Sequence, residues 1–261
     1  MSYAAPARIQ SYGDAPFVII CDHASNDIPD DLGLLGLDPV ELSKHIAWDI
    51  GAAALSTQIA RHLDGAAILC AHSRLLVDVN RAPEDDAAIP AVSDGIAIVG
   101  NQQMSPSMRT QRLERFHEPY HALLEKTVAS SASRHNQLLV FSVHSYAPRL
   151  EATNEAMRSN SIEKSASDHD RPWHIGLLSN IDQQTARLML DWLHKHTDYY
   201  IGDNEPYDGR IFSYTVDRHA GRRNLPHVTF EVRNDLLSTP AQIAEMGKIL
   251  TRGIRHIAAQ L

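Results

Sequence analysis

Polar side chains suited to binding a carboxylate are concentrated in one short stretch, residues 73–81, which reads Ser-Arg-Leu-Leu-Val-Asp-Val-Asn-Arg. Arg81 offers a planar guanidinium that fits a carboxylate, and Asn80 offers a neutral donor and acceptor. Asp78 is counted with them as a candidate substrate-binding residue, a buried acceptor that can hold Arg81 or Arg74 in position. The stretch therefore predicts a clamp for an acidic ligand, although an ion pair that only caps a strand would use the same residues.

Two histidines and one carboxylate supply a second kind of chemistry. His23 follows the apolar run 15–21, His144 follows the apolar run 138–143, and Asp49 lies in an apolar, Ala-rich stretch. Two histidines and a carboxylate with one open position are the usual protein ligands of a hydrolytic zinc. Taken singly, each of these residues would serve equally well as an ordinary loop or helix-surface residue. Together they predict one zinc ion per chain.

A hydrolytic zinc needs further groups around it. Zinc lowers the pKa of its bound water to about 7, and a carboxylate then has to take the proton. Glu231, in the alternating segment 227–233, is the candidate base, and Arg74 is the candidate that stabilises the oxyanion. Asn26 competes with Asp49 as third ligand, although a neutral amide is a poorer zinc ligand than a carboxylate.

Other chemistries find less support in the sequence. A turn-rich loop at 204–210 contains Asn204, a candidate substrate-binding residue. Ser25 and Ser145 each adjoin a candidate histidine, but neither lies in the Gly-x-Ser-x-Gly turn of serine hydrolases. The chain contains neither the Gly-x-Gly-x-x-Gly motif nor a Walker-type phosphate loop. The metal-dependent interpretation is therefore preferred to a serine hydrolase.

The composition is that of an ordinary globular protein without a nucleic-acid or membrane surface. The 261 residues carry a formal net charge of −8, which argues against nucleic acids and anionic membranes as partners. No apolar run approaches the roughly 20 residues that span a bilayer, and the N-terminus lacks a signal-peptide pattern. Cys21 and Cys70 lie in apolar runs, so we expect both to be core residues. We expect one cytoplasmic domain comprising residues 1–261.

Alternating strands and helices have to position the polar residues. Apolar or alternating runs predict strands at 15–21, 66–70, 75–79, 138–143, 173–178, 199–201 and 227–233. Helical spacing predicts helices at 41–63, 106–133, 183–194, 215–223 and from Pro240, with kinks at Gly51 and Pro119 and an N-cap at Thr239. Loops at 81–103 and 147–171 are long enough to close over a site. This alternation predicts an α/β fold with a mainly parallel or mixed sheet and helices on both faces.

Several short motifs, taken together and in this order, make the chain resemble the N-formylglutamate amidohydrolase family from Phe17 to Leu237. The matching stretches are Asp22-His23-Ala24-Ser25-Asn26 with Ile28-Pro29, Trp48-Asp49, Ser73-Arg74 through Arg81, His144-Ser145, Asn204-Glu205-Pro206-Tyr207 with Gly209, and Glu231-Val232-Arg233-Asn234-Asp235-Leu236. The resemblance implies a zinc-exopeptidase-like (phosphorylase/hydrolase-like) three-layer fold and a hydrolase that cuts an amide next to a carboxylate-bearing amino acid. It also implies that Asn80 and Arg81 hold the substrate. By the same analogy Arg74 polarises the carbonyl and Glu231 is the base.

The residues and the resemblance lead to one interpretation, a zinc-dependent amidohydrolase acting on a small N-acylated amino acid such as N-formyl-L-glutamate. The His-Ala-Ser-Asn sequence at 23–26 replaces the His-Ser-Gly or His-Gly-Gly turn of the family's histidine-degrading enzymes, which indicates a divergent branch. Two alternatives share the fold. One is a non-catalytic protein that binds small carboxylates, and the other is a peptidase or amidase acting on cell-wall peptides, which would need a cleft open to long substrates.

Overall fold

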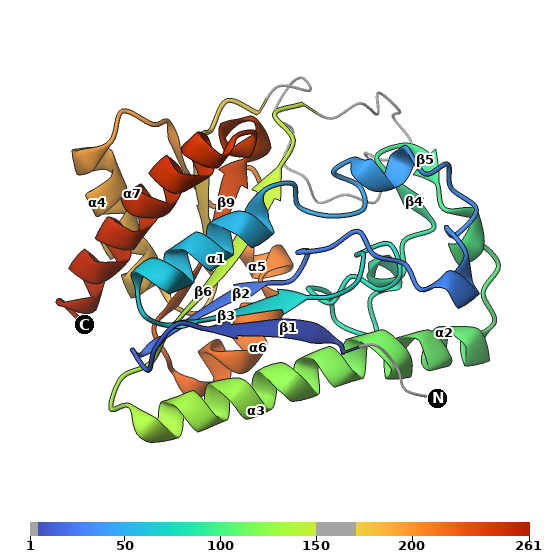
Figure 1. Ribbon diagram of the computed structural model, residues 1–261, viewed down its shortest axis with the longest axis horizontal. Helices are drawn as coiled ribbons and strands as arrows, with labels where there is room; N and C mark the ends of the chain where they lie inside the picture. Colours follow the sequence, from blue (N-terminus) through green and yellow to red (C-terminus); the bar gives the residue numbers. More distant parts are fainter. Residues whose placement is uncertain (1–4, 150–170) are drawn as a thin grey trace.

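The computed structural model describes residues 5–149 and 171–261, and within them a seven-stranded, mostly parallel sheet forms the centre of the molecule (Figure 1). Its strands are β1 (Ala7–Ser11), β2 (Phe17–Cys21), β3 (Ala66–Cys70), β6 (Leu139–Tyr146), β7 (Ile175–Leu178), β8 (Ile201–Asp203) and β9 (His227–Arg233). They follow the order β1-β3-β2-β6-β9-β7-β8. Strand β1 is antiparallel to β3 and β7 is antiparallel to β9, while the remaining neighbours are parallel. The predicted mixed sheet is confirmed.

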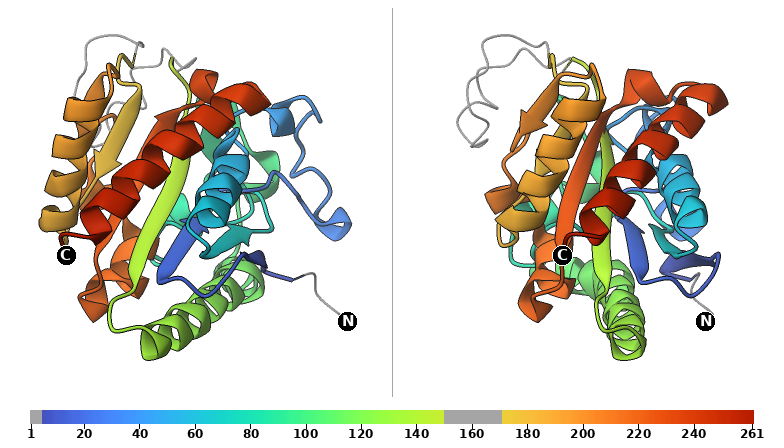
Figure 2. Two further views of the ribbon diagram at one scale, coloured as in Figure 1. Left: turned by 60° about the vertical axis from the view of Figure 1, so that its left-hand side comes forward. Right: turned by 90° about the vertical axis from the view of Figure 1, so that its left-hand side faces the viewer.

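Helices cover both faces of this sheet. One face carries α1 (Ala52–His62), α4 (Gln183–His196) and α7 (Pro240–Ala258), and α1 runs beside α7 in each view (Figure 1, Figure 2). The other face carries α3 (Glu118–Arg134) and α6 (Tyr214–His219). In β2, Ile19 packs with the first group of helices, whereas Val18 and Ile20 pack with the second. Successive strand residues point to opposite faces, so the continuous apolar run in β2 reflects cover on both sides.

One long helical stretch is divided into three parts. It consists of α2 (Pro106–Arg112), a π-helical turn (Leu113–His117) and α3. The predicted helix over 106–133 is therefore confirmed, with its division beside Pro119. Pro119 lies in the first turn of α3 and lacks the N–H that a regular α-helix would use there, which gives the break a local cause.

The predicted strand over 75–79 is wrong. Residues 74–76 form a turn in which the Leu76 amide donates to the Ser73 carbonyl, and the Asp78 amide donates to the Ala88 carbonyl in a neighbouring loop. Leu75, Leu76 and Val77 are nevertheless buried, because they belong to a separate apolar cluster beneath the loops. A short apolar run indicates that its residues are buried but not which structure buries them. Here the residues are buried by packing between loops and not by the sheet.

The predicted helix over 41–63 is also wrong in its first half. A short 3-10 turn covers Glu41–Ser43, and α1 begins only at Ala52. Gly51 has a φ of 84°, and a Cβ there would lie 2.5 Å from Leu237 Cβ. Glycine at this position permits both the left-handed backbone and the close approach, so the helix starts after it. Asp49 consequently lies in a loop and not on a helix.

The other predicted elements need only small changes. Strand β6 extends to Tyr146, so His144 lies inside a strand and not after it. Helix α6 ends at His219, and a 3-10 turn follows at Gly221–Arg223. The strand predicted at 199–201 is β8, which begins at Ile201. The Thr239 side chain accepts a hydrogen bond from the Gln242 amide, which confirms the N-cap of α7. The loop predicted at 147–171 lies almost entirely outside the described residues.

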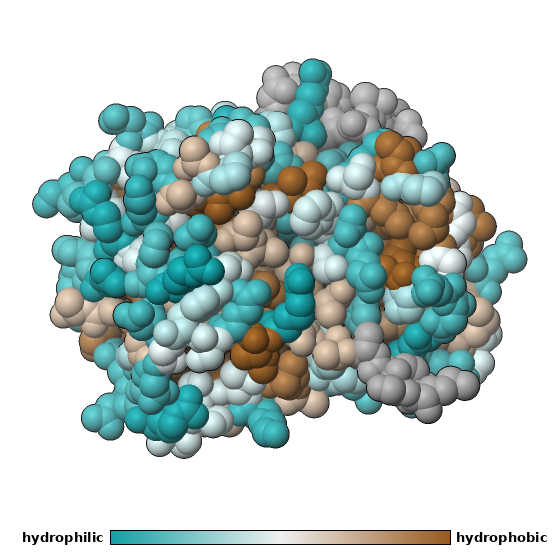
Figure 3. All heavy atoms as spheres, in the orientation of Figure 1, coloured by the Kyte–Doolittle hydropathy of each residue, from teal (hydrophilic) through white to brown (hydrophobic). Residues whose placement is uncertain are grey.

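The predicted long loop at 81–103 contains a small hairpin of its own, β4 (Val92–Ser93) and β5 (Ile96–Ala97). Hydrophobic side chains gather on the surface near this hairpin (Figure 3). Val92 of β4 and Val99, two residues after β5, are both exposed. Among the helices of residues 5–149 and 171–261, none combines the length and hydrophobicity that crossing a bilayer requires. Cys21 and Cys70 are both buried and unpaired, as expected.

Candidate functional site

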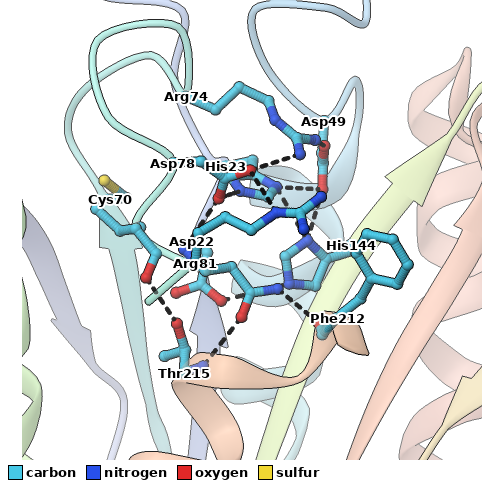
Figure 4. A network of polar contacts seen from close by, with 12 residues as sticks. Asp22, His23, Asp49, Cys70, Arg74, Asp78, Arg81, His144, Phe212 and Thr215 are labelled. Atoms are coloured by element: carbon cyan, nitrogen blue, oxygen red, sulfur yellow. Dashed lines mark hydrogen bonds and ion pairs between the residues drawn. The ribbon is translucent and has the colours of Figure 1, made fainter. Parts of the chain in front are cut away.

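His23, Asp49 and His144 meet in one buried cluster (Figure 4). His144 Nδ1 lies 2.8 Å from Asp49 Oδ2, His23 Nδ1 lies 3.3 Å from the same oxygen, and the two Nδ1 atoms are 3.2 Å apart. Each of the three residues is only 3% exposed. The structure thus brings together all three residues that the sequence predicts as metal ligands, and one ligand atom from each could share a metal ion.

The cluster is assembled at the carboxyl ends of two neighbouring parallel strands. His23 lies two residues beyond β2, and His144 lies near the end of β6, which pairs with β2. The Asp49 amide donates to the His23 carbonyl at 2.9 Å, and this bond fastens the loop before α1 to the strand end. Asn26, the competing third ligand, instead donates its side-chain amide to the Leu42 carbonyl at 2.7 Å. The position of Asp49 therefore fits a ligand better than that of Asn26.

A further carboxylate lies behind each imidazole. His23 Nε2 is 2.8 Å from Asp78 Oδ1, and His144 Nε2 is 3.3 Å from Asp22 Oδ2. The Tyr120 hydroxyl donates to the other oxygen of Asp22 at 2.7 Å. The Asp78 carboxylate favours the proton of His23 on Nε2, so the His23 Nδ1 lone pair points into the cluster, whereas His144 has a carboxylate beside each ring nitrogen. The arrangement is the one that orients histidines towards a metal.

Sequence reasoning did not assign a role to Asp22 or Tyr120. Asp22 directly follows β2 and precedes a candidate ligand, and this adjacency was a usable signal. Tyr120 offered none, because its helical spacing indicated only a core position, and its ring does pack in the core between α3 and the sheet. The link between the two depends on the tertiary fold.

The acidic surroundings favour positive charge in the cluster. Burial alone would lower the pKa of His144, but its contacts with Asp22 and Asp49 raise that pKa well above the ordinary value. Burial would likewise raise the pKa of Asp49, yet the charge of His23 and the hydrogen bond with His144 hold it well below its usual range. A site that stabilises an extra proton in this way also stabilises a cation.

Two arginines border the cluster. Arg74 donates to Asp78 Oδ2 at 2.8 Å and lies 3.5 Å from Asp49 Oδ1, and its side chain is 30% exposed. Arg81 Nε is 3.9 Å from Asp78 Oδ2, and its guanidinium lies over the Phe212 ring at 4.6 Å (Figure 4). Asp78 therefore holds both arginines as well as His23. This confirms the expectation that it is a buried acceptor for Arg74 or Arg81.

The two asparagines predicted to contact substrate are bonded to the protein backbone. Asn80 donates to the Phe212 carbonyl at 2.9 Å and accepts from the Thr215 amide at 3.0 Å. Asn204 Oδ1 accepts from two backbone amides, those of Ser179 and Gly209, each at 3.0 Å. Both side chains thus fix the shape of the loops around the site.

Glu231 stands beside the cluster on β9. It pairs across the sheet with His144 of β6 and is 6% exposed, and its Oε2 has no hydrogen-bond partner among the described residues. Burial raises the pKa of Glu231, and the positive charge of His144 lowers it by a smaller amount, so that the pKa is raised to about 7. A carboxylate in this condition exchanges a proton readily near neutral pH.

The chain is similar to a known family and to solved structures over nearly all of its length. A family model described as N-formylglutamate amidohydrolase matches residues 15–238. A crystal structure of a gene product from Agrobacterium tumefaciens is 25% identical and has a TM-score of 0.86, over 98% of this chain and 97% of the other. The structure of N-formylglutamate amidohydrolase from Ralstonia eutropha JMP134 shares the fold at 18% identity, with a TM-score of 0.68 over 98% of each chain. None of the curated proteins matches the chain.

Proposed function

The chain belongs to the N-formylglutamate amidohydrolase family, and from this premise we propose that it hydrolyses the amide bond of a small N-acylated amino acid such as N-formyl-L-glutamate. The family supports an amidohydrolase acting on a small molecule. The proposal adds a metal-dependent mechanism and treats residues 1–261 as a single amidohydrolase domain.

The observation that carries the metal-dependent mechanism is the convergence of three acceptor atoms. His23 Nδ1, His144 Nδ1 and Asp49 Oδ2 lie within 3.3 Å of one another in a buried place. Unprotonated, these atoms repel each other, so the arrangement requires a proton or a cation between them. The family resemblance makes zinc the candidate, and one bound ion would supply a water of lowered pKa and a Lewis acid for the amide carbonyl.

Three further residues of the chain have separate roles in the proposed reaction. The Glu231 carboxylate takes the proton that the attacking water loses. Arg74, partly exposed beside Asp49, places its guanidinium where negative charge develops on the carbonyl oxygen. Arg81 binds a carboxylate of the substrate, while Asp78 keeps both arginines in position.

Asn80 and Asn204 contribute by positioning. Each holds a loop next to the site through two hydrogen bonds to backbone groups, so each supports the walls against which the substrate lies. A purely binding protein of this fold would need the arginine clamp. It would not need three converging acceptors backed by further carboxylates.

Metal content tests the proposal directly. Protein purified without chelator should contain about one metal ion per chain, as judged by elemental analysis, and should hydrolyse N-formyl-L-glutamate. His144→Ala should lose both the metal and the activity, because it removes a ligand. His194→Ala, on the exposed end of α4, is the matched control and should retain both. Absence of metal in the wild type after zinc is added back would leave a non-catalytic carboxylate-binding protein as the better description.

A further inference from the structure

A pocket of about 320 Å³ is lined in part by Arg81. None of the three candidate metal ligands lines it. Its walls come from the loop after Arg81, from residues 209–214 and from helix α6 with the turn that follows. Ile211 contributes an apolar surface, and Arg218 and Arg222 contribute cationic side chains. The pocket is thus separate from the cluster and shares Arg81 with the candidate substrate clamp.

Two of the arginines that line this pocket are paired with carboxylates, and two are not. Arg81 is 3.5 Å from Asp85, and Arg210 forms a two-pronged pair with Asp208. Neither Arg218 nor Arg222 forms an ion pair with any described residue. Arg218 donates to the Tyr214 hydroxyl at 2.7 Å, and its guanidinium lies over the ring of the same tyrosine at 5.8 Å.

Asp217 is the second carboxylate in the pocket wall, and it already has partners elsewhere. One of its oxygens accepts from the Asn180 side chain at 2.8 Å, and the other is 3.6 Å from His227. Two arginines without carboxylate partners in one pocket of a protein with a net charge of −8 indicate an anionic ligand.

Ser213 gives the same pocket a buried polar group. It is 3% exposed, and its hydroxyl has no hydrogen-bond partner among residues 5–149 and 171–261. Buried hydroxyls in folded proteins nearly always have a partner, so a lone one in a pocket wall suits a ligand atom. Ser213 also directly follows Phe212, whose ring stacks on Arg81 and whose carbonyl holds Asn80.

We propose that this pocket binds the additional carboxylates of an extended acidic substrate, so that the preferred substrates carry a second acidic residue beyond the one whose amide is cut. One carboxylate of the first residue lies at Arg81, and those of the second lie at Arg218 and Arg222. The aliphatic part of the second residue packs on Ile211. This inference rests on the proposed amidohydrolase function and concerns the length of the substrate.

Kinetics on two matched substrates test the inference. N-formyl-γ-L-glutamyl-L-glutamate should show a KM about tenfold lower than N-formyl-L-glutamate, because it adds charge-assisted hydrogen bonds to unpaired arginines. Arg218→Ala and Arg222→Ala should each remove most of that advantage and leave the KM of the short substrate unchanged. Arg252→Ala is the matched control, an exposed arginine on α7 across the sheet. Equal effects of the pocket variants on both substrates, or no effect on either, would overturn the inference while leaving the proposed function intact.

A binding measurement separates the pocket from the chemistry. Calorimetry with unformylated γ-L-glutamyl-L-glutamate needs no turnover, so it remains informative for a protein that does not hydrolyse either substrate. Binding that Arg222→Ala weakens about tenfold supports the pocket. Inorganic phosphate is the second probe. If phosphate binds in an Arg222-dependent manner and the dipeptide does not, the pocket is a small-anion site and the extended substrate is ruled out.

Discussion

The candidate site could be predicted from the sequence mainly through single side chains at or near the ends of apolar runs. His23, His144 and Asp49 were predictable as a group, since charged or titratable residues next to buried apolar runs are costly without a purpose. Their partners were harder to foresee. Asp78 was expected to hold an arginine, and its bond to His23 Nε2 appears only in the folded chain. The sequence suggested Asn80 and Asn204 as substrate contacts, but it could not show that their side chains bond to backbone groups.

Glu231 gives the sharpest test at the residue scale. Glu231→Gln keeps the shape of the side chain and removes its ability to take a proton. We expect hydrolysis of N-formyl-L-glutamate to fall by about 10² to 10⁴ while metal content stays at the wild-type level. Glu245→Gln, an exposed carboxylate on α7, is the control and should behave as wild type. Near-normal turnover in Glu231→Gln would exclude this residue as the base.

Glu231 should also determine how the rate of turnover depends on pH. Burial raises the pKa of Glu231 to about 7, and a general base has to be deprotonated to work. The wild-type kcat/KM should therefore fall as pH decreases through the region at or below 7, since a bound cation nearby would favour the carboxylate. A profile that stays flat from pH 8 to pH 5 would be incompatible with this role.

At the element scale, sequence patterns identified strands and helices but not the loops that carry function. The apolar run at 75–79 and the first half of the helical spacing at 41–63 both reflected burial, and in these two places the buried residues belong to loops. Those loops hold Asp78 and Asp49. Helix pattern and proline together did locate the break near Pro119, because that signal is local in the chain. The conformations of these loops depend on contacts between residues far apart in the chain, and the periodicity of a sequence segment carries no information about such contacts.

The break near Pro119 places two histidines against the arginine loop. His117, at the end of the π-helical turn, lies with Nε2 2.9 Å from the Arg81 carbonyl, and His121 Nε2 lies 2.9 Å from the Val79 carbonyl. A carbonyl only accepts, so both Nε2 atoms donate. His121 Nδ1 lies 2.8 Å from His219 Nε2. Two helical residues four apart thus hold the backbone on either side of Asn80.

The hydrogen bond from His121 to the Val79 carbonyl predicts that a substitution in α3 will weaken substrate binding. His121→Leu leaves the buried Val79 carbonyl with one donor fewer, which should cost about 1 to 3 kcal/mol of stability and loosen Arg81. We expect the KM for N-formyl-L-glutamate to rise several-fold with a smaller change in kcat. His121→Gln, whose amide can still donate, should recover part of the loss. Lower stability with an unchanged KM would reduce His121 to a structural residue.

At the scale of the whole molecule, the alternation of strands and helices correctly predicted a mixed sheet covered on both faces. It could not predict the order β1-β3-β2-β6-β9-β7-β8 or the two antiparallel pairings. Strand order depends on which edges meet after the chain crosses the sheet, and a single sequence does not encode this locally. The sheet order nevertheless decides the site, because it places β2, β6 and β9 side by side with their functional residues.

The same packing buries two histidines whose titration makes the stability of the fold depend on pH. Burial, followed by neighbouring positive groups, lowers the pKa of His121 to about 3, and burial is also the main cause that lowers the pKa of His219 to about 4. An unfolded histidine titrates near 6.5, so between pH 6.5 and about 4 the unfolded chain binds more protons at these two positions. Stability from this source is complete above pH 6.5 and is lost as pH falls through that window.

Glu231 acts in the opposite direction, because its pKa is raised to about 7 and the folded chain holds its proton more tightly. Among these three groups the two histidines outweigh the one carboxyl, so their combined contribution to the thermal midpoint should fall on acidification from pH 6.5 to 4, by about 2 to 4 °C for each kcal/mol lost. Scanning calorimetry on two variants separates the contributions. His121→Leu should flatten the decline because it removes one buried histidine, and Glu231→Gln should steepen it because it removes the opposing group. If both variants decline as the wild type does, these buried groups do not control the acid stability of the fold.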